Sequence, residues 1–280
     1  MKKQRKYGKL LRPLVYVVLL LYAMVTLYPF LWAVSASFKT FKEITGGGIS
    51  IVPKHFTFQN YIDLFAQTAY YPRWFLNSLF IAVAGTAVNV ILNSMAGYAL
   101  AQITFKGSKA FLSIFIAAMT IPQQVLLIPN YLIIKALGMM GSYNALIIPG
   151  AVNVTYIFLM RQYFMNFSKQ VEEAAKIDGL SRNGCFFRIA LPLSKPVLAT
   201  QATFVFLGFW NDFTRSMLYI KDVKKFTLPV GIQATQSQTA GFTMWNEILT
   251  ASVISMVPIL IIYIVLNRYF MTGLRMEAEK

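Results

Sequence analysis

The sequence predicts an all-α integral membrane protein with six transmembrane helices and with both the N-terminus and the C-terminus in the cytoplasm. The chain of 280 residues is 57% hydrophobic and only 13% charged, whereas about 25% of the residues in soluble domains are charged. Six stretches are apolar enough to cross a bilayer, because a helix of roughly 20 residues spans the hydrocarbon core and satisfies its own backbone. Most of the 26 Lys and Arg residues fall in segments that this arrangement places in the cytoplasm, since basic flanks resist translocation.

The six predicted spans cover approximately residues 14–36, 75–101, 110–134, 145–165, 196–219 and 248–267. The third and fifth spans are interrupted by Pro122, Pro129, Asn211, Asp212 and Arg215. The sequence shows no repeat with a period of about 20–50 residues and no matched pair of broken helices that would indicate inverted halves. We therefore expect residues 1–280 to form a single membrane domain.

The first span resembles a secretory signal peptide in its basic N-terminal flank. Its apolar run, however, exceeds the roughly 7–15 residues of a signal peptide. Tyr28, Pro29 and Trp32 also stand where a cleavage site requires small residues. We expect this segment to be retained as a transmembrane helix.

The formal net charge of +16 is accounted for by basic residues solvated at the membrane surface, so no nucleic-acid partner is expected. Cys185 is the single cysteine and His55 the single histidine, which excludes an internal disulfide and a metal site built on several Cys or His ligands. We expect Cys185 to be simply a small residue and His55 an incidental loop residue. No cofactor is expected in this chain.

The first outer segment, residues 37–74, combines a glycine run at 46–48 with Phe56, Phe58, Tyr61 and Phe65. We expect a small ordered cap or a short interfacial helix. Aromatic residues gather at the membrane–water interface for physical reasons. This role is favoured over contact with a partner outside the membrane, which stays the alternative.

The longest cytoplasmic loop, residues 166–195, joins the fourth and fifth spans. Residues 170–178 are rich in helix formers, and Glu172 and Lys176 make an i,i+4 pair in the favourable order. Val171, Ala174, Ala175 and Asp178 share one face of this helix. A neighbour could approach the backbone closely over the two alanines.

A second helix follows in the same loop. Gly179 stands where a helix ends in a left-handed cap, and Ser181 can cap the next helix. That helix contains Phe186, Phe187, Ile189 and Leu191, and Pro192 and Pro196 end it and start the fifth span. Such a pair of helices can be pushed as a rigid body, and a helical hairpin that only pads the membrane surface is the alternative.

Residues at fixed spacing in this loop match the EAA loop of ABC importer permeases, so the chain resembles that family. The matching residues are Glu173, Ala174, Ala175, Gly179, Ile189, Leu191 and Pro192. The segments YPFLWAVSASFK, NSLFIAVAGTAVNVILNSMAGYALA, MTIPQQVLLIPNYL, FLMRQYF and FWNDF also look like the carbohydrate branch. Within that branch the chain is similar to the shorter permease of maltose-type and other oligosaccharide importers.

The resemblance implies a type I ABC importer permease in the plasma or inner membrane of a prokaryote, in contact with lipid. The implied partners are a homologous permease in a heterodimer, two ATP-binding cassette subunits that bind ATP and Mg, and an extracytoplasmic sugar-binding protein. The loop would dock in the ATPase and couple its closure to alternating access. The residues implied in this coupling are Glu173, Ala174, Ala175, Asp178, Gly179, Ile189, Leu191 and Pro192.

The resemblance also places the outer segment 222–245 against the sugar-binding protein. Its end, GIQATQSQTAGFTMW, is rich in Gln, Thr and Gly, and we expect it to be flexible. Asn211 and Asp212, which precede this segment, are expected to anchor a helix end rather than bind sugar.

Neutral polar side chains inside the spans provide the hydrogen-bonding groups that a sugar needs. They are Asn77, Asn89, Asn93, Ser94, Thr120, Gln123, Gln124, Asn130, Asn153 and Gln201. Such groups also bond one membrane helix to another, so no substrate-binding residue is assigned.

The sequence contains no Walker-type loop and no H-E-x-x-H motif, so we expect no catalysis in this chain and ATP hydrolysis in a partner chain. A secondary transporter is one rival, but its coupling carboxylates would be Asp212 and Glu247, both near span ends. A permease of the same kind for amino acids, phosphate or a metal is the other. An anionic substrate would call for buried Lys or Arg, which the spans almost lack.

Overall fold

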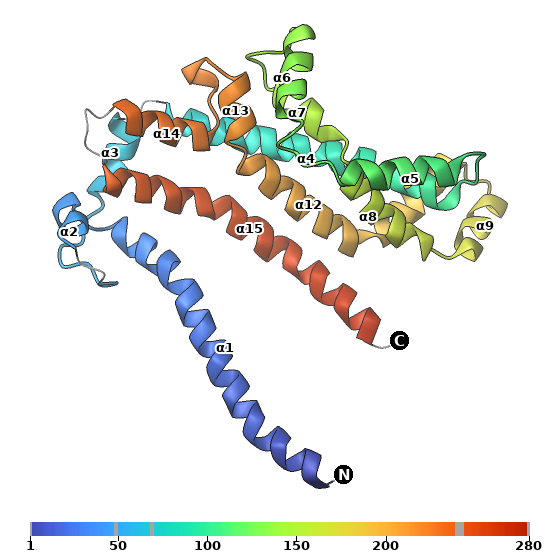
Figure 1. Ribbon diagram of the computed structural model, residues 1–280, viewed down its shortest axis with the longest axis horizontal. Helices are drawn as coiled ribbons and strands as arrows, with labels where there is room; N and C mark the ends of the chain where they lie inside the picture. The colour runs from blue at the N-terminus through green and yellow to red at the C-terminus, as the bar shows by residue number, and fades with distance from the viewer. Residues whose placement is uncertain (1, 48–49, 68–69, 239–243, 279–280) are drawn as a thin grey trace. The chain divides into compact units, whose positions relative to one another are not determined.

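The structure, a computed structural model, describes residues 2–47, 50–67, 70–238 and 244–278, and within these ranges it contains helices and no β-strand. The described residues form two compact units. One unit comprises residues 1–69 and 234–257, and the other comprises residues 70–233 and 258–280. Figure 1 shows the helices of both.

Three helices are long and apolar enough to cross a membrane by length and composition, among the residues described. They contain Pro13–Ala36 in α1 (Lys2–Ala36), the whole of α4 (Tyr71–Gln102), and Trp245–Asn267 in α15 (Trp245–Ala278). Two bent pairs raise this number to five if each counts as one span. The predicted spans 14–36, 75–101 and 248–267 each lie inside one of the three long helices.

The other predicted spans are broken. Residues 145–165 form α7 (Asn144–Ala151) and α8 (Val154–Met165), bent by 40°. Residues 110–134 divide into α5 (Ser108–Met119) and α6 (Leu127–Ala136). The break contains Pro122, which lacks an amide proton and disfavours helical geometry at the residue before it. Residues 196–219 divide into α12 (Lys195–Trp210) and α13 (Thr214–Tyr219), with Asn211 and Asp212 in the break.

In the unit of residues 70–233, α4 is the central helix, and α7, α8 and α12 all pack against it (Figure 1). Glycines permit this close packing. A Cβ atom at Gly97 of α4 would lie 2.6 Å from the Met160 Cβ and 2.8 Å from the Arg161 nitrogen of α8. The two helix backbones therefore meet at Gly97, as small residues allow in membrane bundles.

The ring of Phe209 on α12 is held between two further glycines. A Cβ at Gly85 of α4 would lie 2.6 Å from this ring, and a Cβ at Gly150 of α7 would lie 2.5 Å from it. The ring fills the space that both missing side chains leave. Phe209 therefore fixes the mutual positions of α4, α7 and α12.

The segment that begins at residue 222 is tied to the start of α4. Trp74 donates its indole N–H to the Val223 carbonyl at 2.7 Å, and the Asn77 amide donates to the carbonyls of Lys224 and Phe226. Helix α14 (Leu228–Gln238) continues the segment after the short 3₁₀ turn η2 (Val223–Lys225). Residues 231–238 are thus helical, and residues 239–243 lie outside the described residues.

The unit of residues 1–69 and 234–257 contains the expected ordered cap. It includes α2 (Phe41–Thr45) and α3 (Gln59–Gln67). Phe38 stacks on Phe56 with ring centroids 5.0 Å apart, and the Asn60 amide donates to the Ser37 and Lys39 carbonyls. The backbone N–H groups of Lys54 and then His55 donate to the Glu43 carboxylate and hold its pKa below the ordinary value. His55 therefore contributes to this turn through its backbone N–H.

Candidate functional site

The loop of residues 166–195 begins with α9 (Lys169–Ile177), which confirms the first predicted helix. Gly179 follows with φ +80°, a conformation that residues with a Cβ rarely adopt. The Leu180 N–H then donates to the Ala175 carbonyl at 3.0 Å, which is the long bond of a Schellman cap. The chain therefore turns sharply at the predicted glycine. The predicted pair of Glu172 with Lys176 lies outside the described side chains, because that of Lys176 is not described.

The second half of the loop is a continuous helical segment from Arg182 to Leu193. Ser181 caps it by accepting the Gly184 N–H at 3.2 Å, as predicted. Within it, α10 (Arg182–Cys185) leads into a π-helical turn, η1 (Phe186–Ala190), and then into α11 (Leu191–Leu193). The chain bends by 82° before it enters α12.

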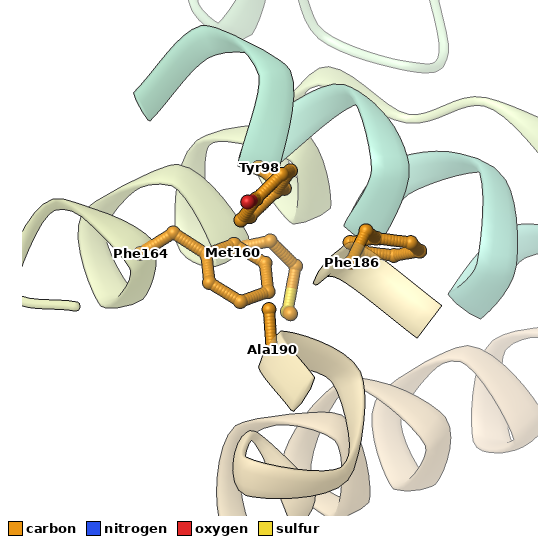
Figure 2. Close-up of a cluster of buried hydrophobic side chains, with 5 residues drawn as sticks. All are labelled: Tyr98, Met160, Phe164, Phe186 and Ala190. Atoms are coloured by element: carbon orange, nitrogen blue, oxygen red, sulfur yellow. The ribbon is translucent and has the colours of Figure 1, made fainter. Parts of the chain in front are cut away.

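A buried cluster attaches this segment to the helix bundle. Figure 2 shows Tyr98, Met160, Phe164, Phe186 and Ala190 turned toward one another. Tyr98 comes from α4, Met160 and Phe164 from α8, and Phe186 and Ala190 from the π turn. The Tyr98 ring lies 5.3 Å from both the Phe164 ring and the Phe186 ring. The loop therefore packs directly against α4 and α8.

Hydrogen bonds support the same attachment. Tyr98 donates its hydroxyl to the Cys185 sulfur at 3.6 Å, and Tyr163 donates its hydroxyl to the Leu193 carbonyl at 3.0 Å. The Ser194 hydroxyl donates to the Ala190 carbonyl at 2.6 Å. Cys185 is fully buried, so its position agrees with the expectation of a small packing residue.

The coupling residues expected from the sequence divide into covered and open positions. Glu173, Ala174, Asp178, Gly179 and Pro192 are exposed, whereas Ile189 and Leu191 are half-buried. Ala175 is only 3% exposed. The expected open face of two alanines is therefore wrong for Ala175, because α9 turns this residue toward its own chain. Ile177, which the sequence did not single out, is 86% exposed.

A second site is a cavity of about 390 Å³ among α4, α6, α7, α8, α12 and α13. This volume lies within the range of roughly 300–1,000 Å³ for small-molecule sites. Five of the ten polar residues singled out in the spans line it, namely Asn89, Gln123, Gln124, Asn130 and Asn153. Tyr156, Phe209, Asp212 and Arg215 also line the cavity.

The cavity amides fall into two groups. Asn89 donates to the Gly150 carbonyl at 2.7 Å, and Asn153 accepts the Thr155 N–H as a helix cap. In contrast, the side chains of Gln123, Gln124 and Asn130 make no hydrogen bond within the described residues. The first group holds the wall in place, and the second is available to a ligand.

The remaining polar residues of that set serve the structure. Gln201 donates to the Asn89 side-chain oxygen at 3.0 Å, and Asn93 bonds to backbone atoms of Asn89, Ala151 and Asn153. Asn77 holds the outer segment, and Thr120 bonds the Ala117 carbonyl within its own turn. Ser94 is buried on α4, outside the cavity wall.

The sequence reasoning missed an ion pair in the cavity wall. The Arg215 Nε lies 2.6 Å from one carboxylate oxygen of Asp212, and the other oxygen accepts the Arg215 backbone N–H at 3.2 Å. Asp212 thus anchors the start of α13, as expected, but it also faces the cavity. The i,i+3 spacing of Asp212 and Arg215 in the sequence indicates that such an ion pair can form. This pairing weakens the interpretation of Asp212 as a free coupling carboxylate.

Residues 93–276 match the family model described as "Binding-protein-dependent transport system inner membrane component". The "Arabinooligosaccharides transport system permease protein AraQ" of Halalkalibacterium halodurans is 33% identical, over 99% of both chains. "Protein LplC" of Bacillus subtilis is 38% identical, over 91% of this chain and 90% of the relative.

A solved structure shares the fold. It is a bacterial ABC transporter involved in the import of the acidic polysaccharide alginate. The match has a TM-score of 0.83 at 25% identity and covers 94% of this chain and 97% of the other. The overall fold therefore recurs in a membrane transport protein.

Proposed function

This chain belongs to the family of binding-protein-dependent transport system inner membrane components, and we propose that it is the permease subunit of an ATP-driven importer for a di- or oligosaccharide. The arabinooligosaccharide relative and the alginate transporter support a saccharide as the substrate. The amide-lined cavity supports the same class, because each carboxamide offers both a donor and an acceptor to hydroxyl groups.

In this proposal residues 1–280 form one transmembrane domain with six spans and both termini in the cytoplasm. The three long helices supply three of these spans, α7 with α8 and α12 with α13 supply two more, and α5 with α6 supplies the remaining one as a broken span. Broken backbone is tolerated at membrane depth where it lines a cavity. The break between α5 and α6 contains Gln123 and Gln124, which line the cavity.

The observation that carries the coupling role is the buried cluster of Figure 2. The open residues Glu173, Ala174 and Asp178 contact the ATPase, and Gly179 sets the turn between the two loop helices. Ile189, Leu191 and Pro192 belong to the helical segment that carries Phe186 and Ala190 into the bundle, and Ala175 packs inside the loop. Closure of the ATPase then displaces α4 and α8 together, since a packed element of this kind has few intermediate arrangements.

The proposed assembly contains a homologous permease in a heterodimer, two ATP-binding cassette subunits that hold ATP and Mg, and an extracytoplasmic sugar-binding protein. The segment of residues 222–245 faces that protein. This chain itself is a non-catalytic, multi-pass subunit in the plasma or inner membrane of a prokaryote.

The test is a substitution at the turn. Gly179→Val places a β-branched residue at φ +80°, which costs about 1–2 kcal/mol in the left-handed region. We expect the assembled complex to hydrolyse ATP while sugar uptake per ATP falls at least about fivefold, because a strain of about 1 kcal/mol changes an equilibrium constant by about that factor. Gly107→Val is the matched control, since Gly107 has φ +90° and open space around it but lies outside the loop.

Both variants are compared in proteoliposomes by measuring ATP hydrolysis and labelled sugar uptake on the same preparations. Normal uptake per ATP by the Gly179 variant, or an equal loss in the Gly107 variant, would remove the coupling role from this turn.

A further inference from the structure

The cavity holds one charged pair among otherwise neutral groups, and this pair bears on which saccharides enter. The wall combines the three uncommitted amides Gln123, Gln124 and Asn130 with the aromatic side chains of Tyr156 and Phe209. Amides suit hydroxyl groups, and aromatic faces suit the apolar side of a sugar ring. The wall also contains the charged residues Asp212 and Arg215, and binding of a neutral sugar does not require charged groups.

We propose that Asp212 sets the charge preference of this cavity: it closes Arg215 into a neutral ion pair, so the cavity is a subsite for uncharged saccharide units and rejects sugar carboxylates. This inference rests on the proposed function as a saccharide importer. It names Asp212 as a specificity-determining residue and Arg215 as the group that Asp212 masks.

The carboxylate of Asp212 has both of its oxygens occupied by Arg215. Both carboxylate oxygens of Asp212 are engaged by Arg215, one by Nε at 2.6 Å and one by the backbone N–H at 3.2 Å. The Asp212 side chain is only 12% exposed, whereas that of Arg215 is 29% exposed. The carboxylate is therefore held in one place and neutralises the guanidinium from within the wall.

The guanidinium is open on its other side. Its central carbon lies 5.9 Å from the centre of the Phe209 ring, and this ring is itself held between Gly85 and Gly150. The guanidinium forms an ion pair with Asp212 and makes no hydrogen bond within the described part of the chain. Arg215 is thus held in one orientation with unused N–H donors. Without the negative charge of Asp212, such a guanidinium can bind a carboxylate through two hydrogen bonds.

A carboxylate that entered the intact cavity would meet Asp212 beside Arg215. The two negative charges would share one positive charge in a medium of low dielectric constant, where repulsion between like charges is strong. A hydroxyl group has no such penalty. Asp212→Asn removes the negative charge with little change in size and keeps an oxygen that can accept the Arg215 N–H.

The experiment uses the complete transporter of this chain, its sister permease and its ATPase subunits, purified in detergent without the external binding protein. Two probes are compared by calorimetry: a neutral trisaccharide that the wild-type complex imports, and trigalacturonate. We expect Asp212→Asn to shift the ratio of the two affinities at least about tenfold toward trigalacturonate, as expected for loss of one buried like charge. Arg215→Gln should shift the ratio the other way.

Asp222→Asn is the matched control, because Asp222 caps the 3₁₀ turn outside the cavity and carries the same charge. It should leave the affinity ratio unchanged. The double variant Asp212→Asn, Arg215→Gln should lose the gain in trigalacturonate binding. If Asp212→Asn does not assemble, the opposite shift in Arg215→Gln and the behaviour of the double variant carry the test.

An unchanged ratio in both single variants would overturn the inference, as would an equal shift in Asp222→Asn. A wild-type complex that imports only uronate sugars would also overturn it and would leave the proposed function intact. A correctly assembled complex that imports no saccharide with any cognate binding protein would instead overturn the proposed function.

Discussion

Single glycines decide how closely the helices of the 70–233 unit approach. Gly97 meets α8 at the Met160 Cβ, and Gly85 and Gly150 leave room for one phenylalanine ring. In a lipid environment helices associate through packing and hydrogen bonds rather than through the hydrophobic effect. A methyl group at such a contact therefore acts directly on the stability of the bundle.

Gly97→Ala should destabilise the protein, because the added Cβ would lie 2.6 Å from the Met160 Cβ and 2.8 Å from the Arg161 backbone nitrogen. Overpacking of this kind costs about 1–3 kcal/mol. The measurement is thermal unfolding of the purified complex in detergent. Gly208→Ala on α12 is the control, since a Cβ there meets no atom within 4 Å, and an equal loss of stability in both variants would contradict this packing argument.

Residue-scale reasoning from the sequence succeeded where the backbone conformation is local. Gly179 was predicted as a left-handed cap and Ser181 as a helix cap, and the structure confirms both. It could not distinguish Ala174 from Ala175, because neighbouring helical residues point about 100° apart and the covering residues come from elsewhere in the chain. In the sequence, only the i,i+3 spacing of Asp212 and Arg215 indicates that Asp212 neutralises Arg215.

At the scale of elements, the loop of residues 166–195 is attached to α4 and α8 by aromatic packing. Phe186 is 3% exposed and Ala190 is fully buried, and they stand four residues apart on one face of the π turn. The π turn was not predicted, since local preferences favour an α-helix and tertiary contacts determine such an insertion. The predicted interruptions at Pro122, Asn211 and Asp212 agree with the breaks, whereas Pro129 lies inside α6 and Arg215 inside α13.

Phe186→Ala should weaken this attachment. Loss of a large buried ring costs about 3–5 kcal/mol, and the loop should then move without carrying α4 and α8. We expect lower sugar uptake per ATP in complexes that still assemble and hydrolyse ATP, together with a lower unfolding temperature. The control is Phe187→Ala, whose side chain is 47% exposed.

Proteoliposome assays on the two variants, normalised to the amount of assembled complex, check this prediction. If Phe187→Ala uncoupled transport as strongly as Phe186→Ala, the buried cluster would not be the connection between loop and bundle.

At the scale of the whole molecule, composition and hydropathy suffice to predict a helical membrane protein, since lipid permits few other folds. The cavity could not be predicted, because its wall is assembled from residues 89 to 215 across several elements. Five of the ten polar residues of the spans line it, whereas Asn93 and Gln201 bond one helix to another. The chemical nature of an amide is the same in both roles, so only its neighbours distinguish them.

We propose that this chain is a permease subunit driven by ATPase partners through the loop of residues 166–195. The most direct test reconstitutes the purified chain alone and in complex with its sister permease and ATPase subunits, and measures ATP hydrolysis and sugar uptake with the binding protein present. We predict neither activity for the chain alone, and both for the complex, with uptake dependent on ATP. Robust hydrolysis by the isolated chain, or sugar uptake without the ATPase subunits, would contradict the account.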